Sequence, residues 1–120
     1  QVIIAGLKRD EELVLLLSKH KVLVVPSSYD EPFGIVALEG IACGCVVVGS
    51  AGGGLPEAIG PCGITVPNGD AGSLAQALEH LLLNPNERKR LLCRAPKHLA
   101  RFHPTTIAEK YLTLFHSKLS

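Results

Sequence analysis

Two carboxylates flank a short turn in the stretch Glu31-Pro-Phe-Gly-Ile-Val-Ala-Leu-Glu39. Pro32 and Gly34 predict that a helix opens near Gly34, which places Glu39 ~7.5 Å along its axis. The free N–H groups and the positive dipole end of a helix start attract phosphate. A carboxylate holds neighbouring hydroxyls well, because each oxygen accepts one O–H bond. The pattern therefore suits a sugar nucleotide.

Each acid also has an ordinary structural explanation. An arbitrary helical glutamate is most often a solvated surface residue. Glu39, however, has apolar neighbours on several sides of the predicted helix, and an acid among them needs a partner. Glu31 could accept hydrogen bonds from the hydroxyls of a bound sugar, or could compensate the helix dipole, which is worth ~0.3–1 kcal/mol. Glu39 is thus the stronger candidate for binding. For Glu31 taken alone, the structural explanation is slightly preferred.

Backbone groups supply the remaining candidates for binding. The N–H groups of Phe33, Gly34 and Ile35 would contact phosphate or sugar, and Gly34 allows a close approach. The loop Gly52-Gly53-Gly54 could hold an anion through successive N–H groups, although glycine triplets are also ordinary flexible loops. Glu57 is interpreted first as an acid in the first turn of a helix and second as a brace behind the site.

Continuous runs rich in β-branched residues predict strands that are covered on both faces, as in parallel sheets. These runs are Val2 to Ala5, Val22 to Val25, Val46 to Ser50 and Gly63 to Val66. Helical patterns separate them, at Asp10 to His20, at Gly34 to Cys43 with a left-handed cap at Gly44, and at Leu55 to Ile59. The alternation predicts an α/β fold with right-handed crossovers and a Rossmann-like parallel sheet. Such sheets bind ligands at the carboxyl ends of their strands.

Helices alone are predicted after the last strand. Asp70 leads an amphipathic helix that Asn84-Pro85 ends, and Asn86 is predicted to cap the next helix, which kinks at Pro96. A last helix is predicted to start at Thr105 or Thr106. The sequence thus predicts a single partial domain over residues 1–120, with flanking helices and a helical C-terminal end.

Composition limits the classes of function. The 120 residues suit one domain, and a net charge of +1 with few aromatic residues argues against a nucleic-acid partner. The four cysteines lack a C-x-x-C spacing, which favours reduced thiols, no zinc and a cytoplasmic location. The chain opens directly in a predicted strand, so we expect it to be a piece of a larger protein.

A stripe of basic residues lies at helical spacing in the last third of the chain. It consists of Arg90, Arg94, Lys97 and Arg101. The stripe is either a solvated face or a contact with anionic lipid, which would place the protein peripherally at the inner membrane face. The five histidines form no spaced metal pair, so we expect neither a metal site nor a histidine base.

Taken together, six motifs resemble the donor-binding, C-terminal half of GT-B glycosyltransferases, and most closely the retaining family-4 group, also called group 1. They are Pro26-Ser27-Ser28, the E-P-F-G-x-x-x-L-E run from Glu31 to Glu39, Ala42-Cys43-Gly44, Val46 to Val48, Gly53-Gly54-Leu55-Pro56-Glu57, and Gly63. The resemblance covers nearly the whole chain. Each motif alone is weak, and the combination is specific.

The resemblance implies an enzyme that transfers sugar from a nucleotide-diphosphate donor with retention and without a bound metal or other cofactor. Glu39 would hold the ribose hydroxyls, and Glu31 would be the catalytic-site residue that holds the hexose hydroxyls. The amides of Phe33, Gly34 and Ile35 and the loop Gly53-Gly54 would contact the donor. Group-1 enzymes use an Arg and a Lys for the diphosphate, and these and the acceptor domain normally lie upstream. The piece alone is therefore expected to be inactive.

Two departures and two alternatives accompany this resemblance. Gly40 stands where the family usually has Ala, and Cys45 stands where it usually has Pro, and both changes predict altered packing only. A sugar-nucleotide epimerase on the same fold is one alternative, and the upstream half would distinguish it. A non-catalytic nucleotide-binding module is the other.

Overall fold

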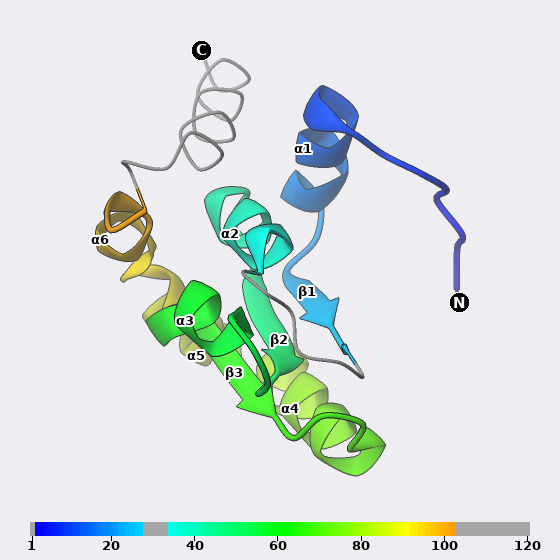
Figure 1. Ribbon diagram of the computed structural model, residues 1–120, viewed down its shortest axis with the longest axis vertical. Helices are drawn as coiled ribbons and strands as arrows, with labels where there is room; N and C mark the ends of the chain where they lie inside the picture. The colour runs from blue at the N-terminus through cyan, green and yellow to red at the C-terminus, as the bar shows by residue number, and fades with distance from the viewer. Residues whose placement is uncertain (1, 28–33, 103–120) are drawn as a thin grey trace.

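Three parallel strands form the centre of the fold (Figure 1). They are β1 (Val22–Val25), β2 (Val46–Ser50) and β3 (Gly63–Val66), in the order β1-β2-β3. The register pairs Val22 with Val46 and Val47 with Gly63. The computed structural model describes residues 2–27 and 34–102. The predicted Rossmann-like α/β fold with a parallel sheet is confirmed.

Both faces of the sheet are covered by helices. Side chains alternate between faces along a strand. Val47 packs with α2 (Ile35–Ala42), α3 (Leu55–Ile59) and α6 (Ala95–Ala100), whereas Val46 and Val48 pack with α4 (Ala71–Leu83) and α5 (Pro85–Leu92). Figure 1 shows α2 and α3 in front of the sheet and α4 and α5 behind it. Every residue of β2 is buried, as the continuous valine run predicts.

Helix α1 (Asp10–Ser18) packs beside the start of β2. Its Val14 and Leu17 form a cluster with Cys43 and Cys45. The Cys45 thiol donates to the carbonyls of Leu17 at 3.3 Å and of His20 at 3.4 Å, and the Cys45 N–H donates to the Gly40 carbonyl at 2.9 Å. A proline at position 45 could make none of these bonds. All four cysteines are free thiols, as predicted.

Gly40 lies where α2 meets β1. A Cβ atom at this position would stand 2.5 Å from Cδ2 of Leu23. An alanine therefore fits only if Leu23 moves. The departure from the family pattern at Gly40 thus has a local packing cause, as expected.

The predicted strand from Val2 to Ala5 is wrong for the described part of the chain. Residues 2–9 have no regular structure, and Figure 1 shows them running away from the sheet. The exposed fraction is 88% for Val2 and 89% for Ile4. A strand needs a neighbour for its backbone hydrogen bonds and a surface for its apolar side chains. No described residue offers either to this segment.

The C-terminal helices follow the prediction with two corrections. Asp70 caps α4 as its side chain accepts from the Ser73 N–H at 3.0 Å. The prediction that Asn86 caps the next helix is wrong, because Pro85 begins α5 and makes Asn84 the cap position. The predicted kink is a break, since α5 ends at Leu92 and α6 starts at Ala95 with Pro96 in its first turn. The helix predicted from Thr105 or Thr106 lies outside the described residues.

Candidate functional site

Loops at the carboxyl ends of the strands are tied together by hydrogen bonds. The buried Ser50 hydroxyl, at the end of β2, donates to the Ser27 carbonyl after β1 at 2.7 Å. The Gly52 N–H donates to Oδ1 of Asn68 after β3 at 3.1 Å. These bonds fix the edge of the sheet at which parallel folds bind ligands.

Gly34 sets the start of α2. Its φ is +75°, in the left-handed region that side chains disfavour. A Cβ atom here would stand 3.0 Å from Cδ2 of Leu55 and 3.1 Å from Cβ of Ala58. The backbone at Gly34 therefore lies directly against α3.

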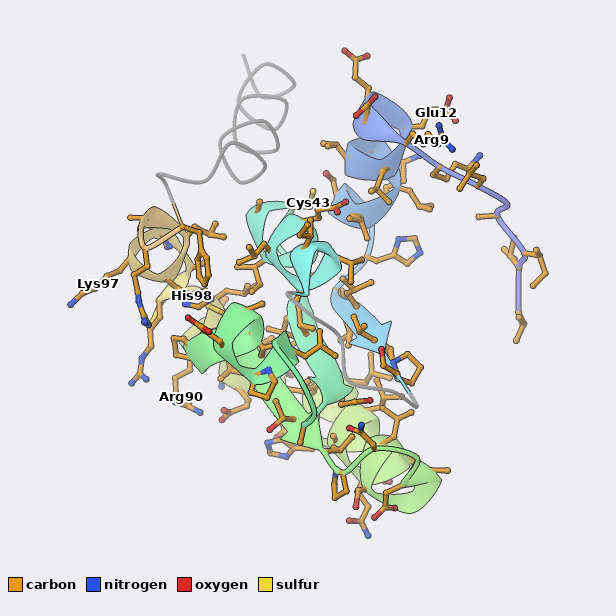
Figure 2. All side chains as sticks on the ribbon, viewed as in Figure 1. Arg9, Glu12, Cys43, Arg90, Lys97 and His98 are labelled. Atoms are coloured by element: carbon orange, nitrogen blue, oxygen red, sulfur yellow. The ribbon has the colours of Figure 1, made fainter. Side chains whose placement is uncertain are left out.

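Glu39 is buried in the middle of α2. Only 8% of the residue is exposed, so it is not a solvated surface acid. One turn further along, burial raises the pKa of the Cys43 thiol, and the negative charge of Glu39 adds to this rise against a hydrogen bond from Ser18. Figure 2 shows Cys43 between α2 and α1. The charge of Glu39 is thus felt at Cys43, one helical turn away on the same helix.

The glycine loop after β2 is less uniform than its sequence suggests. Gly53 has a φ of +63° and is exposed, whereas Gly54 occupies the position before α3 with an ordinary φ of −87°. The Gly52 N–H is already bound to Asn68. In this structure the Gly52 N–H is thus occupied, which leaves Gly53 and Gly54 as the predicted contacts in this loop. Glu57 is exposed in the first turn of α3, which is the position expected of an acid that interacts with the helix dipole.

A pocket of about 150 Å³ lies at the same edge of the sheet. It is lined by Pro26, Ser50, Val66, Pro67, Gly69, Asp70, Ala71 and Leu74. Hydrogen bonds from the Ser73 backbone and hydroxyl lower the pKa of Asp70, which therefore stays ionised as the cap of α4. The motifs did not predict this pocket. The rule that ligands bind at strand ends could have pointed to it, since Val66 ends β3.

The structure does not place every predicted residue. Glu31 and Phe33 lie outside the described residues. Gly34 immediately precedes α2, Ile35 and Glu39 lie on it, and Gly53 and Gly54 lie just before α3, which packs against the start of α2. Backbone donors at a helix start and a buried carboxylate on the same helix together suit a ligand that carries both an anion and hydroxyls.

The described residues form neither a metal-binding cluster nor a membrane-spanning helix. In ranges 2–27 and 34–102, no three His, Cys, Asp or Glu side chains gather in a way that could hold a metal ion. No helix there is both long and apolar enough to cross a membrane.

The sheet order, the covered faces and the strand-end loops define a Rossmann-like α/β domain. The sequence identifies the family, because the family model for glycosyl transferases group 1 matches residues 1–98. The chain belongs to this family of glycosyltransferases.

Several curated glycosyltransferases are similar to this chain. The D-inositol 3-phosphate glycosyltransferase of Corynebacterium jeikeium is 40% identical over 107 residues, which cover 88% of this chain and 25% of that protein. The enzyme of the same name from Streptomyces bingchenggensis is 45% identical over 94 residues, 77% of this chain and 20% of that protein. The MMP alpha-(1->4)-mannosyltransferase of Mycolicibacterium hassiacum is 41% identical over 85 residues, 68% of this chain and 20% of that protein. The chain thus spans a quarter or less of each of these relatives.

Proposed function

We propose that this chain is the donor-binding part of a retaining glycosyltransferase that uses a nucleotide-diphosphate sugar. The observation that carries the proposal is the burial of Glu39 on the helix that Gly34 opens at the ligand-binding edge of the sheet. Burial holds this carboxylate in one place on the helix, and an ionised carboxylate accepts O–H bonds from ribose hydroxyls well. Membership of the group-1 family supports the same assignment.

Each predicted residue takes one part of the donor in this proposal. Glu39 holds the ribose hydroxyls, and Glu31 holds the hexose hydroxyls. The amides of Phe33, Gly34 and Ile35 meet the diphosphate or sugar, because helix N-termini favour anions. Gly53 and Gly54 complete the backbone contacts.

The reaction proposed for this donor keeps the configuration of the anomeric carbon. The bond between that carbon and the phosphate oxygen breaks, and the acceptor oxygen bonds to the same face of the sugar. The acceptor proton passes to the departing phosphate oxygen. Oriented amides and fixed positive groups stabilise the charge that develops on the diphosphate, so no metal is needed.

The complete activity requires more protein than these 120 residues. The acceptor site and the basic residues that hold the diphosphate are assigned to the rest of the enzyme, of which this chain would be about a quarter by the length of its relatives. D-inositol 3-phosphate is the first acceptor to assay, because two of the relatives carry it in their names.

Glu39→Gln in the full-length protein tests the proposal. The amide keeps the size of the side chain and loses the ionised acceptor, so we expect donor affinity to fall about tenfold or more. Titration calorimetry with UDP-, GDP- and ADP-sugars measures the affinity, and the melting temperature reports folding. Product analysis by NMR separates transfer from epimerisation of the donor and from binding without turnover.

The matched control is Glu57→Gln, which removes the same charge from an exposed position on α3. It should leave donor affinity within about twofold of the unmodified protein. If Glu39→Gln lowers the melting temperature strongly, Glu39→Asp keeps the charge in the fold and shortens its reach. Donor binding that survives both changes at Glu39 would overturn the proposal.

A further inference from the structure

A second pocket lies where the short 3-10 helix η1 (Gly60–Cys62) meets the break between α5 and α6. Its volume is about 460 Å³, and it is lined by Pro61, Cys93, Arg94, Lys97, His98 and Arg101. Three of these side chains are cationic, and none is acidic. The pocket therefore concentrates positive charge in a chain whose net charge is only +1.

No described acid neutralises this charge. Within residues 2–27 and 34–102, the ion pairs join Lys8 to Glu12 and Arg90 to Glu87. Arg90 belongs to the same basic stripe but does not line the pocket. The structure thus divides the stripe into one paired arginine on α5 and three cations, Arg94, Lys97 and Arg101, around the pocket.

His98 forms a rigid wall of the pocket. It is 2% exposed, and its Nε2 donates to the Ala58 carbonyl at 2.6 Å. Gly60 lies so close that a Cβ atom there would stand 2.3 Å from Cε1 of the ring, and the Phe102 ring packs edge-on at 5.2 Å between centroids. The other ring nitrogen, Nδ1, is buried without a hydrogen-bond partner. Figure 2 shows Lys97 pointing outward from α6 and His98 lying on the inner side.

The pocket is separate from the proposed donor site. Helix η1 runs directly into Gly63, the first residue of β3, so the pocket lies at the amino end of that strand. Gly34, Gly53 and Gly54 lie at the opposite, carboxyl edge of the sheet. A ligand in the basic pocket is therefore not the donor held by Glu39.

We propose that this pocket binds a phosphate group through Arg94, Lys97 and Arg101. Guanidinium groups offer paired N–H donors that match phosphate oxygens, and Lys97 adds a compact positive charge. Either a soluble phosphorylated molecule or the headgroup of an anionic lipid can present such a group. The shared chemistry is the phosphate, and the two sources are distinguished experimentally.

Titration of inorganic phosphate into the full-length protein tests the site. We expect the double variant Arg94→Gln plus Arg101→Gln to lose phosphate affinity by about tenfold or more, because two charge-assisted contacts are lost. In the unmodified protein, the NMR signals of the His98 ring should shift as phosphate is added. Glu39→Gln should leave this binding unchanged, so the result is independent of the donor proposal.

Lys89→Gln plus Arg90→Gln is the matched control, because it removes two positive charges from α5 outside the pocket. It should retain phosphate affinity within about twofold. If the pocket variant unfolds, Lys97→Gln replaces it, since Lys97 is exposed. Equal losses in the pocket and control variants, or no phosphate binding by the unmodified protein, would refute the site.

Vesicle flotation identifies the source of the phosphate. Binding to phosphatidylcholine vesicles that contain phosphatidylglycerol, lost in the pocket variant and competed by phosphate, assigns a lipid headgroup. Phosphate binding without vesicle binding assigns a soluble ligand. Vesicle binding that the pocket variant keeps would show that the membrane contact lies elsewhere and would remove the lipid assignment.

Discussion

Gly34 combines two constraints that can be measured separately. An alanine in the left-handed region costs about 1–2 kcal/mol, and crowding against Leu55 and Ala58 adds about 1–3 kcal/mol. We therefore expect Gly34→Ala to lower the free energy of unfolding by at least about 2 kcal/mol. Urea denaturation measures the change.

Gly44→Ala isolates the backbone contribution. Gly44 also has a positive φ, of +93°, but a Cβ atom there meets nothing within 4 Å. This variant should lose only about 1–2 kcal/mol. Equal losses at the two glycines would mean that the contact between Gly34 and α3 carries no strain.

The Cys45 thiol links stability to alkaline pH. Burial, with a smaller contribution from Cys43, raises its pKa from 9.0 to about 11. Below pH 9 the thiol is protonated in both states and its contribution is complete. Above pH 9 the unfolded chain ionises first, so stability falls as the pH rises toward 11. Between pH 8 and 10.5, we expect the unmodified protein to lose more stability in urea than Cys45→Ala, and parallel losses would contradict this link.

Glu31 and Glu39 differ in how much of their structural setting could be predicted from the sequence. The burial of Glu39 follows from its apolar neighbours within one helix, since helical periodicity fixes their faces. Which elements pack against α2 depends on residues distant in sequence, such as Leu55 and Ala58 of α3. Glu31 lies outside the described residues, and spacing alone fixes none of its contacts.

Helix α4 depends on its cap at Asp70. The carboxylate accepts from the backbone and hydroxyl of Ser73, and these bonds lower its pKa. Asp70→Ala should lower the melting temperature by a few degrees at pH 7, whereas Asp70→Asn, which retains a cap oxygen, should change it less. Because the folded pKa is depressed, the stabilising effect is present above pH 3.8 and disappears as the pH falls through the folded pKa. Identical melting temperatures for Asp70→Ala and the unmodified protein at pH 7 would refute the role of this cap.

Elements with local signals were predicted well, and elements with distant partners were not. The strands β1 to β3 are continuous β-branched runs, and α4 begins at a capping aspartate, so short-range chemistry suffices. Val2 to Ala5 has the same composition as a strand but lacks a described neighbour to pair with. Asn86 has the right side chain for a cap, yet the ring of Pro85 already fits the first turn of α5.

At the level of the molecule, the isolated 120-residue segment should neither transfer sugar nor bind donor tightly. The diphosphate and acceptor contacts are assigned to the rest of the enzyme. A sugar-nucleotide turnover assay of the segment, beside the full-length protein with and without EDTA, measures both claims. Turnover by the segment would contradict the first, and loss of full-length activity in EDTA would contradict the proposal that no metal is needed.

The strand order β1-β2-β3 also bears on how the domain is made. Each strand pairs with the next one along the chain after a single crossover, so every new strand finds its partner already synthesised. The loop-closure entropy for each such pairing is smaller than for strands that lie further apart in the chain. The sheet can therefore grow one strand at a time as the polypeptide leaves the ribosome, with β2 becoming enclosed only when α4 and α5 arrive to cover its second face.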